Sequence, residues 1–230
     1  MAALKEVRKG KNFVVYSDGN NECILLKDVR FSYPNHGTAR EQKDNDTGRV
    51  RVSWGGVAML EKGKHDETKE ALNKILADLL RKNEATVAKD KRCLKDGDDE
   101  DLGEVPAEYK GHWYVTYNED AARSGAVRPA VRDEFGKLIV DPGKAHDAEY
   151  VARAIKSIDT KFYGGCYGSV LIRPWFFNGK AKDGKTYPKR LLAGYAGVQF
   201  LRDGKPFGTG RIDESAADWD TTSDDGGDGL

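Results

Sequence analysis

Residues 170–177 hold the side chains whose types and spacing are best suited to chemistry. Successive residues of an extended strand point to opposite faces, so Arg173, Trp175 and Phe177 share one face, while the other face is apolar and typical of a core. An arginine is costly to bury beside two large rings, so this face is expected to be open or to line a groove. Bases stack on aromatic rings and a guanidinium pairs with phosphate, so the pattern indicates a surface for unpaired nucleic acid.

A second group of aromatic and basic side chains could extend that surface. Residues 111–117 read as another strand, on which Trp113 and Tyr117 share one face and Tyr114 lies on the other. Opposite faces of one strand cannot all touch one ligand, so some of these rings are expected to be core residues. Three lysines near the predicted strands are candidates for phosphate contact or, alternatively, ordinary solvated residues: Lys110, Lys137 and Lys161.

The charge of the chain changes after Arg211. The last 19 residues carry seven carboxylates and no lysine or arginine, whereas the preceding part holds all 38 basic side chains against 31 acidic ones, a net charge of +7. A basic body attracts phosphate. The acidic segment, residues 213–230, is poor in apolar residues and is expected to be a disordered tail. Such a tail can compete for the basic surface, recruit a basic protein or simply improve solubility; we assign partner binding to its aspartates Asp218, Asp220, Asp224, Asp225 and Asp228.

Signatures of catalysis are missing from the sequence. It has no phosphate-binding Gly-Lys-Ser/Thr loop, no dinucleotide fingerprint and no Gly-x-Ser-x-Gly elbow, and its four histidines are not at zinc-ligand spacing from cysteines. The acidic loop at residues 95–104 fails the EF-hand spacing, with Asp101 where glycine is needed. The sequence therefore predicts neither an enzyme nor a bound cofactor. A metal-dependent nuclease remains an alternative, because carboxylates are abundant.

Most of the chain up to residue 212 reads as strands. The helical exceptions are residues 66–83, which have amphipathic spacing, and a shorter helix after Asp147. This composition predicts a mainly β domain over residues 1–212, a closed or nearly closed antiparallel barrel with one long and one short helical insertion. The expected strands are residues 12–16, 23–31, 49–53, 111–117, 137–140, 162–177, 191–202 and 207–212, with a loop at 37–48 and an Asp-Gly hairpin turn at 203–204.

Three widely spaced cysteines, Cys23, Cys93 and Cys166, argue against a disulfide framework and for a reducing compartment. The sequence has no apolar run of the roughly 18 residues that a membrane-spanning helix needs, and its start lacks the apolar segment of a signal peptide. We therefore expect a cytoplasmic protein, in the host cell if it is viral.

Several segments resemble one family in the same order along the chain. They are VRFSYP at residues 29–34, CLKDGD at 93–98, KFYGGCYGSV at 161–170, LLAGYAGVQF at 191–200 and RDGKPFG at 202–208. Together they resemble the single-stranded-DNA-binding proteins of tailed bacteriophages over most of residues 27–212. The resemblance implies an OB-fold barrel that binds single-stranded DNA without sequence preference, and an acidic tail for replication partners. The tail departs from similar tails in ending with Gly229 and Leu230 rather than a bulky aromatic residue.

These observations lead to a prediction of function. We expect a protein that coats and protects single-stranded DNA in phage replication or recombination, with its acidic tail binding a polymerase, primase or helicase. Self-association through the helix at residues 66–83 is left open. The principal alternative is a protein-binding or virion component whose aromatic strands face a partner chain.

Overall fold

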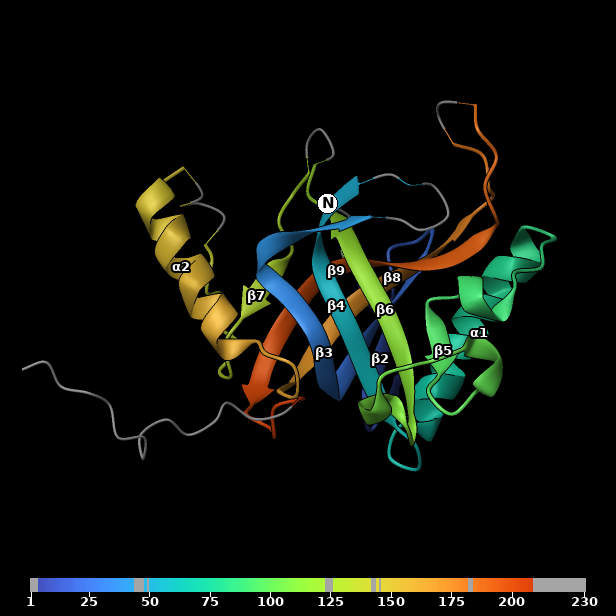
Figure 1. The fold of residues 1–230 in the computed structure, drawn as a ribbon, viewed down its shortest axis with the longest axis horizontal. Coiled ribbons are helices and arrows are strands. Elements are labelled where there is room, and N and C mark those ends of the chain that lie inside the picture. The colour runs from blue at the N-terminus through green and yellow to red at the C-terminus, as the bar shows by residue number, and fades with distance from the viewer. Residues whose placement is uncertain are drawn as a thin grey trace, which may run out of the picture.

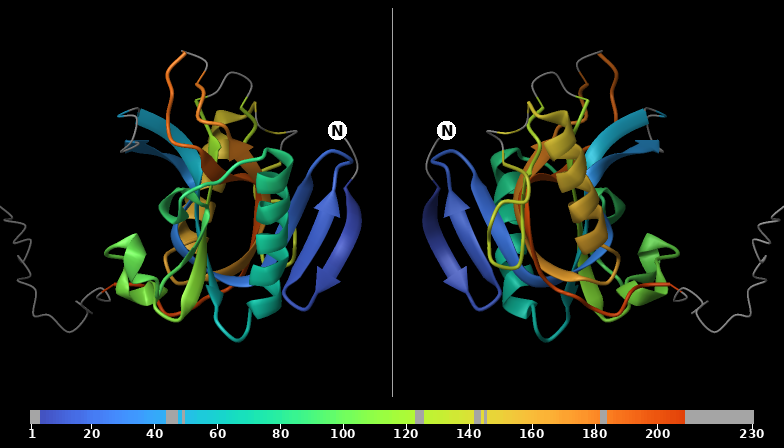
Figure 2. Two further views of the ribbon diagram at one scale, coloured as in Figure 1. Left: turned by 90° about the vertical axis from the view of Figure 1, so that its right-hand side faces the viewer. Right: turned by 90° about the vertical axis from the view of Figure 1, so that its left-hand side faces the viewer.

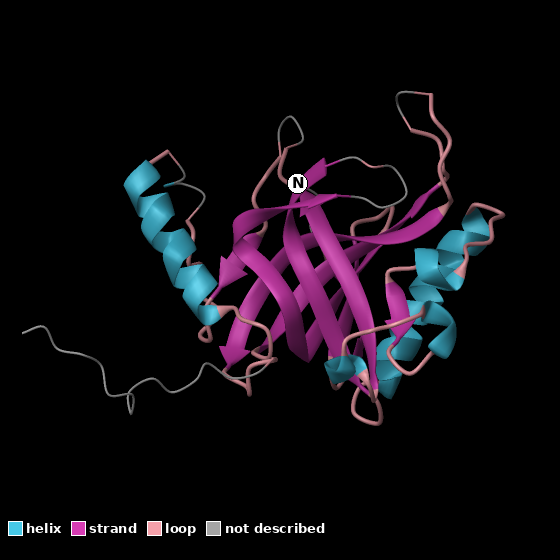
Figure 3. Cartoon of the chain, viewed as in Figure 1, coloured by secondary structure: helices cyan, strands magenta, loops and turns pink. Residues whose placement is uncertain are grey.

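The computed structural model describes residues 4–43, 48, 50–122, 126–141, 144, 146–181 and 184–208, and strands dominate it (Figures 1 and 3). The predicted tail, residues 213–230, lies outside the described residues. Within these ranges, no helix is long and apolar enough to cross a lipid bilayer. The strands are β1 (Lys5–Gly10), β2 (Phe13–Ser17), β3 (Glu22–Lys43), β4 (Val50–Glu61), β5 (Leu94–Asp96), β6 (His112–Asp120), β7 (Ala130–Arg132), β8 (Tyr167–Phe177) and β9 (Arg190–Arg202).

Five of these strands close into a barrel in the order β3-β4-β6-β9-β8, with β8 returning to β3. The register at the closing seam pairs Ile24 with Ile172. All pairs around the barrel are antiparallel except β6 and β9, which meet in parallel at Asn118 and Gly194. A five-stranded barrel of this kind is the OB-fold, so the predicted fold class is confirmed.

Two helices flank the barrel on opposite sides (Figures 1 and 2). The first, α1 (Asp66–Lys82), buries Leu72, Ile75 and Leu76, and places acidic residues in its first turn and basic ones in its last, as the helix dipole favours. The second, α2 (Ala148–Lys161), begins where the Asp147 side chain accepts a hydrogen bond from the Tyr150 amide at 3.0 Å. Both predicted helices are thus confirmed. Short 3-10 turns occur at Lys89–Lys91, Glu100–Leu102 and Ala107–Tyr109.

The barrel interior is apolar and continuous with the packing under both helices. Alternation in β8 places Val170 and Ile172 in this core, fully buried, while Arg173 and Trp175 on the other face are exposed. The predicted two-faced strand is therefore confirmed.

Several predicted boundaries are wrong. The strand expected to end near residue 31 continues as β3 to Lys43, because irregular register near residues 33–39 lets the strand pass its polar and proline residues without ending. After β9 no hairpin forms at residues 203–204: the chain leaves as a loop in which the Phe207 amide donates to the Gly164 carbonyl at 2.9 Å. Residues 137–140 contribute only a bridge between Leu138 and Arg132, and the expected strand at 207–212 lies mostly outside the described residues.

Candidate nucleic-acid interface

The aromatic rings of Trp175 and Phe177 lie where β8 has passed the end of its pairing with β3. Beyond Ile172, β8 pairs only with β9, and Trp175 lies across from Leu192 and Phe177 across from Arg190. Trp175 is 44% exposed, and its ring centroid is 6.4 Å from that of Phe177 in an edge-on arrangement. These two rings line a hollow together with Arg51, Tyr187, Arg190 and Leu192.

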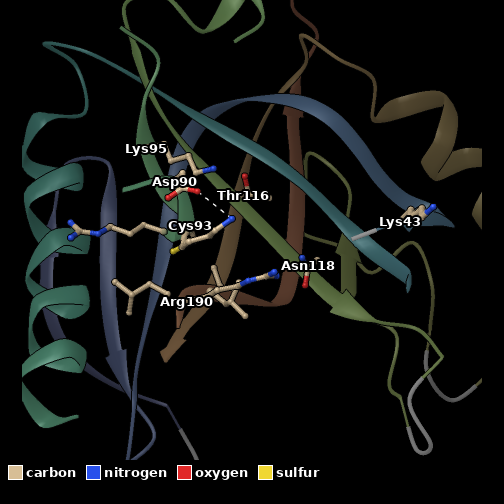
Figure 4. A pocket seen from close by; sticks show the side chains of 12 residues that line it. Lys43, Asp90, Cys93, Lys95, Thr116, Asn118 and Arg190 are labelled. Carbon is tan, nitrogen blue, oxygen red and sulfur yellow. Dashed lines mark ion pairs between the residues drawn. The ribbon is translucent and has the colours of Figure 1, made fainter. Parts of the chain in front are cut away.

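This hollow continues across the outside of the barrel. Arg51, Arg190 and Leu192 also line a second hollow, which includes Lys43 and Asn118. Lys43, Asn118 and Arg190 in turn line a third, a cavity of about 320 Å³ that reaches residues 90–95 (Figure 4). We call the three adjoining hollows the groove.

The groove is positive. Six basic side chains line it, against two acidic ones, Asp90 and Asp120, among the residues that the structure describes. Part of this charge is internally compensated, since the Lys91 ammonium lies 3.2 Å from the Asp90 carboxylate. The six basic residues are Lys43, Arg51, Lys91, Arg92, Lys95 and Arg190.

Burial shifts the pKa values of two residues that line the third hollow. It lowers the pKa of Lys95, because a desolvated ammonium is less stable, and a phosphate nearby would offset that cost. It also raises the pKa of the Cys93 thiol to about 12, which keeps this thiol protonated and poorly reactive at neutral pH. Elsewhere too, no cluster of three or more histidine, cysteine, aspartate or glutamate side chains suited to a metal ion occurs within the described ranges.

The position of the groove follows from the barrel. Lys43 ends β3 and Arg51 lies at the start of β4, so they flank the connection between the first and second barrel strands. Tyr187 belongs to the connection between the fourth and fifth barrel strands, β8 and β9, and Arg190 begins β9. Thr116 and Asn118 lie on the outer face of the third barrel strand, β6. OB-folds bind oligomeric ligands on this strand face and between these two connections.

The predicted rings on β6 do not reach the groove. Tyr117 is 1% exposed and stacks on the His36 ring, with centroids 6.0 Å apart and planes 9° from parallel. Tyr114 is also buried, 4.7 Å from the Tyr109 ring. Trp113 is half-buried beneath the ammonium groups of Lys62 and Lys69. In this arrangement no base can stack on Tyr117 or Tyr114, which serve as core residues.

The predicted arginine and lysines also lie outside the groove lining. Arg173 is exposed on the aromatic face of β8, where its guanidinium lies 3.4 Å from the Asp18 carboxylate and donates to the Cys23 sulfur. Lys110 precedes β6, at the end opposite Thr116 and Asn118. Lys137 follows β7, and Lys161 ends α2 paired with Glu134 at 2.8 Å. The tail aspartates lie outside the described residues.

The sequence prediction missed most of the groove's cations. The sequence does place Arg51 on the polar face of the predicted strand at residues 49–53, and residues 89–95 form a locally basic segment. Nothing in the linear sequence, however, places these segments beside Lys43 and Arg190. Among the predicted binding residues that the structure describes, Trp175 and Phe177 alone line the groove.

Fold and groove together define the class: an OB-fold protein with a basic, aromatic-flanked surface of the kind that accepts an oligonucleotide. The family model for the single-stranded-DNA-binding protein of Enterobacter phage Enc34 matches residues 22–228. The chain therefore belongs to this family, and the resemblance seen in the sequence is confirmed.

Solved structures agree with that assignment. The chain is similar to the single-stranded-DNA-binding protein from bacteriophage Enc34, with 26% identity, a TM-score of 0.60, and coverage of 94% of this chain and 98% of that one. The Enc34 protein in complex with single-stranded DNA matches with 25% identity, a TM-score of 0.60, and coverage of 89% and 98%. The C-terminal truncation of the Enc34 protein matches with 25% identity, a TM-score of 0.61, and coverage of 89% of this chain and 98% of that one. A comparison with curated proteins gives no match.

Proposed function

We propose that this protein binds single-stranded DNA without sequence preference and coats exposed strands during phage replication or recombination in the host cytoplasm. The observation that carries the proposal is the continuity of the groove from the rings of Trp175 and Phe177 to the cations of residues 91–95. The solved complex of the Enc34 protein with single-stranded DNA supports the choice of ligand.

The chemistry of the groove suits a single strand better than a duplex. Unpaired bases expose their aromatic faces, and every base can stack on Trp175 or Phe177, each stack contributing about 1–3 kcal/mol. Arg51 and Arg190 line the same hollow as these rings, where a backbone phosphate would follow a stacked base. Few groups in this arrangement could distinguish one base from another, so we infer binding that tolerates any sequence.

The acidic tail belongs to the same proposal. Its carboxylates would lie against the basic groove when DNA is absent, and DNA would displace them for contact with a polymerase, primase or helicase. Removing the residues after Arg211 is then expected to strengthen DNA binding and to reduce the effect of salt on it. Unchanged affinity of the truncated chain would remove the tail from the binding mechanism, while leaving the groove in place.

A fluorescence titration tests the central claim. Thymine oligonucleotide added to the full chain is expected to quench tryptophan emission, because a base stacks on Trp175. Trp175→Phe should lose most of this quenching but still bind, whereas Trp175→Ala should weaken binding about 5- to 150-fold. The matched control is Trp113→Phe, since Trp113 lies under Lys62 and Lys69, away from the groove; it should retain the quenching. Absence of any binding by the unmodified chain would overturn the proposal and favour a protein-binding surface.

A further inference from the structure

An exposed tyrosine lies at a break in the pairing of β3 with β4. Ser32 pairs with Val57 and Asn35 pairs with Gly55, so Tyr33 and Pro34 together face the single residue Gly56. This is a β-bulge, a device that redirects a side chain from its regular face. Tyr33 has φ +47°, in the left-handed region that non-glycine residues rarely adopt, and the residue is 57% exposed.

Packing of the Tyr33 side chain does not offset the unfavourable backbone conformation of this residue. A buried ring could repay an unfavourable backbone conformation through apolar contacts, but more than half of this residue remains accessible to solvent. Strained backbone that surrounding structure holds in place is concentrated at ligand sites. The combination of strain and exposure therefore points to a ligand for the ring.

Beside Tyr33 the barrel surface is hollowed, because glycines form its floor. A β-carbon on Gly55 would lie 2.2 Å from the Tyr117 carbonyl oxygen, and one on Gly56 would lie 3.1 Å from the Tyr117 hydroxyl. Only glycine at Gly55 lets β4 and β6 approach this closely. The resulting hollow has a volume of about 280 Å³, and Tyr33, Arg40, Gln42, Thr116 and Asn118 are among the residues around it.

The hollow adjoins the groove. It shares Thr116 and Asn118 with the cavity near residues 90–95, and Gln42 with the hollow around Lys43 and Arg51. A single strand of DNA that binds at Trp175 and lies along the groove would thus reach Tyr33 through hollows that adjoin one another. Arg40 is exposed at this end and provides a further positive charge.

We propose that Tyr33 is a base-stacking platform, and that the hollow between its ring and the Gly55–Gly56 floor is a second nucleobase subsite at the end of the groove remote from Trp175. The inference rests on the proposed function and extends it to a residue outside the groove. A base would stack on the phenol ring, with the following phosphate near Arg40. The side-chain amides of Gln42 and Asn118 can each donate and accept hydrogen bonds, so they can meet the edge of any base.

Tyr33→Ala tests this subsite with little risk to folding, because alanine retains the β-carbon and the same backbone conformation while an exposed ring is removed. Affinity for a thymine oligonucleotide of about 16 residues, long enough to span an OB-fold site, should fall about 5- to 150-fold. Tyr33→Phe should bind like the unmodified chain, since stacking needs the ring and not the hydroxyl. Phe135→Ala is the matched control: it removes a ring that is 88% exposed in the turn after β7, and should leave affinity unchanged.

An abasic oligonucleotide of the same length separates stacking from phosphate contact. The unmodified chain and Tyr33→Ala should bind it equally, because it has no base to stack. A remaining difference on the abasic strand, or no loss on the thymine strand, would overturn the subsite. If Trp175→Ala weakens binding while Tyr33→Ala does not, the subsite fails and the proposed function stands. If the unmodified chain binds no single-stranded DNA, both fail.

Discussion

Removing two cations from the middle of the groove should change how salt weakens DNA binding. Lys43 and Arg51 are exposed residues, at the end of β3 and near the start of β4, that both line the second hollow. The double variant Lys43→Gln, Arg51→Gln keeps long polar side chains at both positions and deletes two positive charges. Each phosphate that loses its partner cation no longer releases a counterion on binding.

The magnitude follows from the number of cations in the groove. With single-stranded DNA the logarithm of affinity falls with the logarithm of salt with a slope of about −0.7 for each neutralised phosphate. If each of the six basic side chains meets one phosphate, the slope is about −4, and affinity falls roughly 300-fold between 50 and 200 mM salt. The double variant should have a slope of about −3 and lose only roughly 50-fold over the same range.

The assay is anisotropy of a labelled thymine oligonucleotide titrated at several salt concentrations, with thermal unfolding to show that the variant is folded. Lys110→Gln, Lys137→Gln is the matched control, because it deletes two exposed lysines that lie outside the groove lining. Its slope should equal that of the unmodified chain. Parallel slopes for the groove variant and the unmodified chain, or an equal change in the control, would refute the assignment of phosphate contacts to the groove.

Two further predictions concern the barrel. Burial lowers the pKa of His36 from 6.5 to about 3, so the unfolded chain takes up this proton first as pH falls, and stability is lost from about pH 6.5 down to the folded pKa. Between pH 7.5 and 5.5 the loss from this group is about 1.4 kcal/mol, and urea unfolding of His36→Gln should lack that part of the pH dependence; identical pH profiles would contradict the argument. Gly55→Ala should destabilise the barrel by about 1–3 kcal/mol or more, because its β-carbon meets the Tyr117 carbonyl. Gly194→Ala, whose β-carbon meets only ordinary contacts from 3.5 Å outward, should unfold at a higher temperature than Gly55→Ala, and the reverse order would count against this packing.

Local patterns in the sequence were reliable wherever the deciding contacts are local. The spacing of Leu72, Ile75 and Leu76 is enough to predict α1, because residues three and four apart share one face of a helix. Alternation along β8 likewise separates Ile172 from Trp175 before any partner strand is known. The family resemblance was also present in the sequence, as ordered segments such as KFYGGCYGSV, and the comparison with the family model confirmed it.

Local sequence patterns could not separate buried from exposed side chains where the two lie in similar stretches of sequence. Tyr117 and Trp175 both lie on aromatic strand faces, yet Tyr117 is enclosed by His36 and Tyr195, while Trp175 lies beyond the last residues that pair β8 with β3. Burial depends on which strands pair and where their pairing ends, and the sequence of a single strand specifies neither. For the same reason the polar pattern of residues 37–48 predicts a loop, although pairing with β4 keeps this segment in the sheet as far as Lys43.

The sequence by itself determined a β-rich domain with two helices, a charge imbalance between body and tail, and membership of a DNA-binding family, because these depend on composition, periodicity and residue order. Only the tertiary structure decided where the binding surface lies. Its cations come from segments as distant as Lys43, Lys91 and Arg190, and they meet because barrel closure brings the ends of separate strands together.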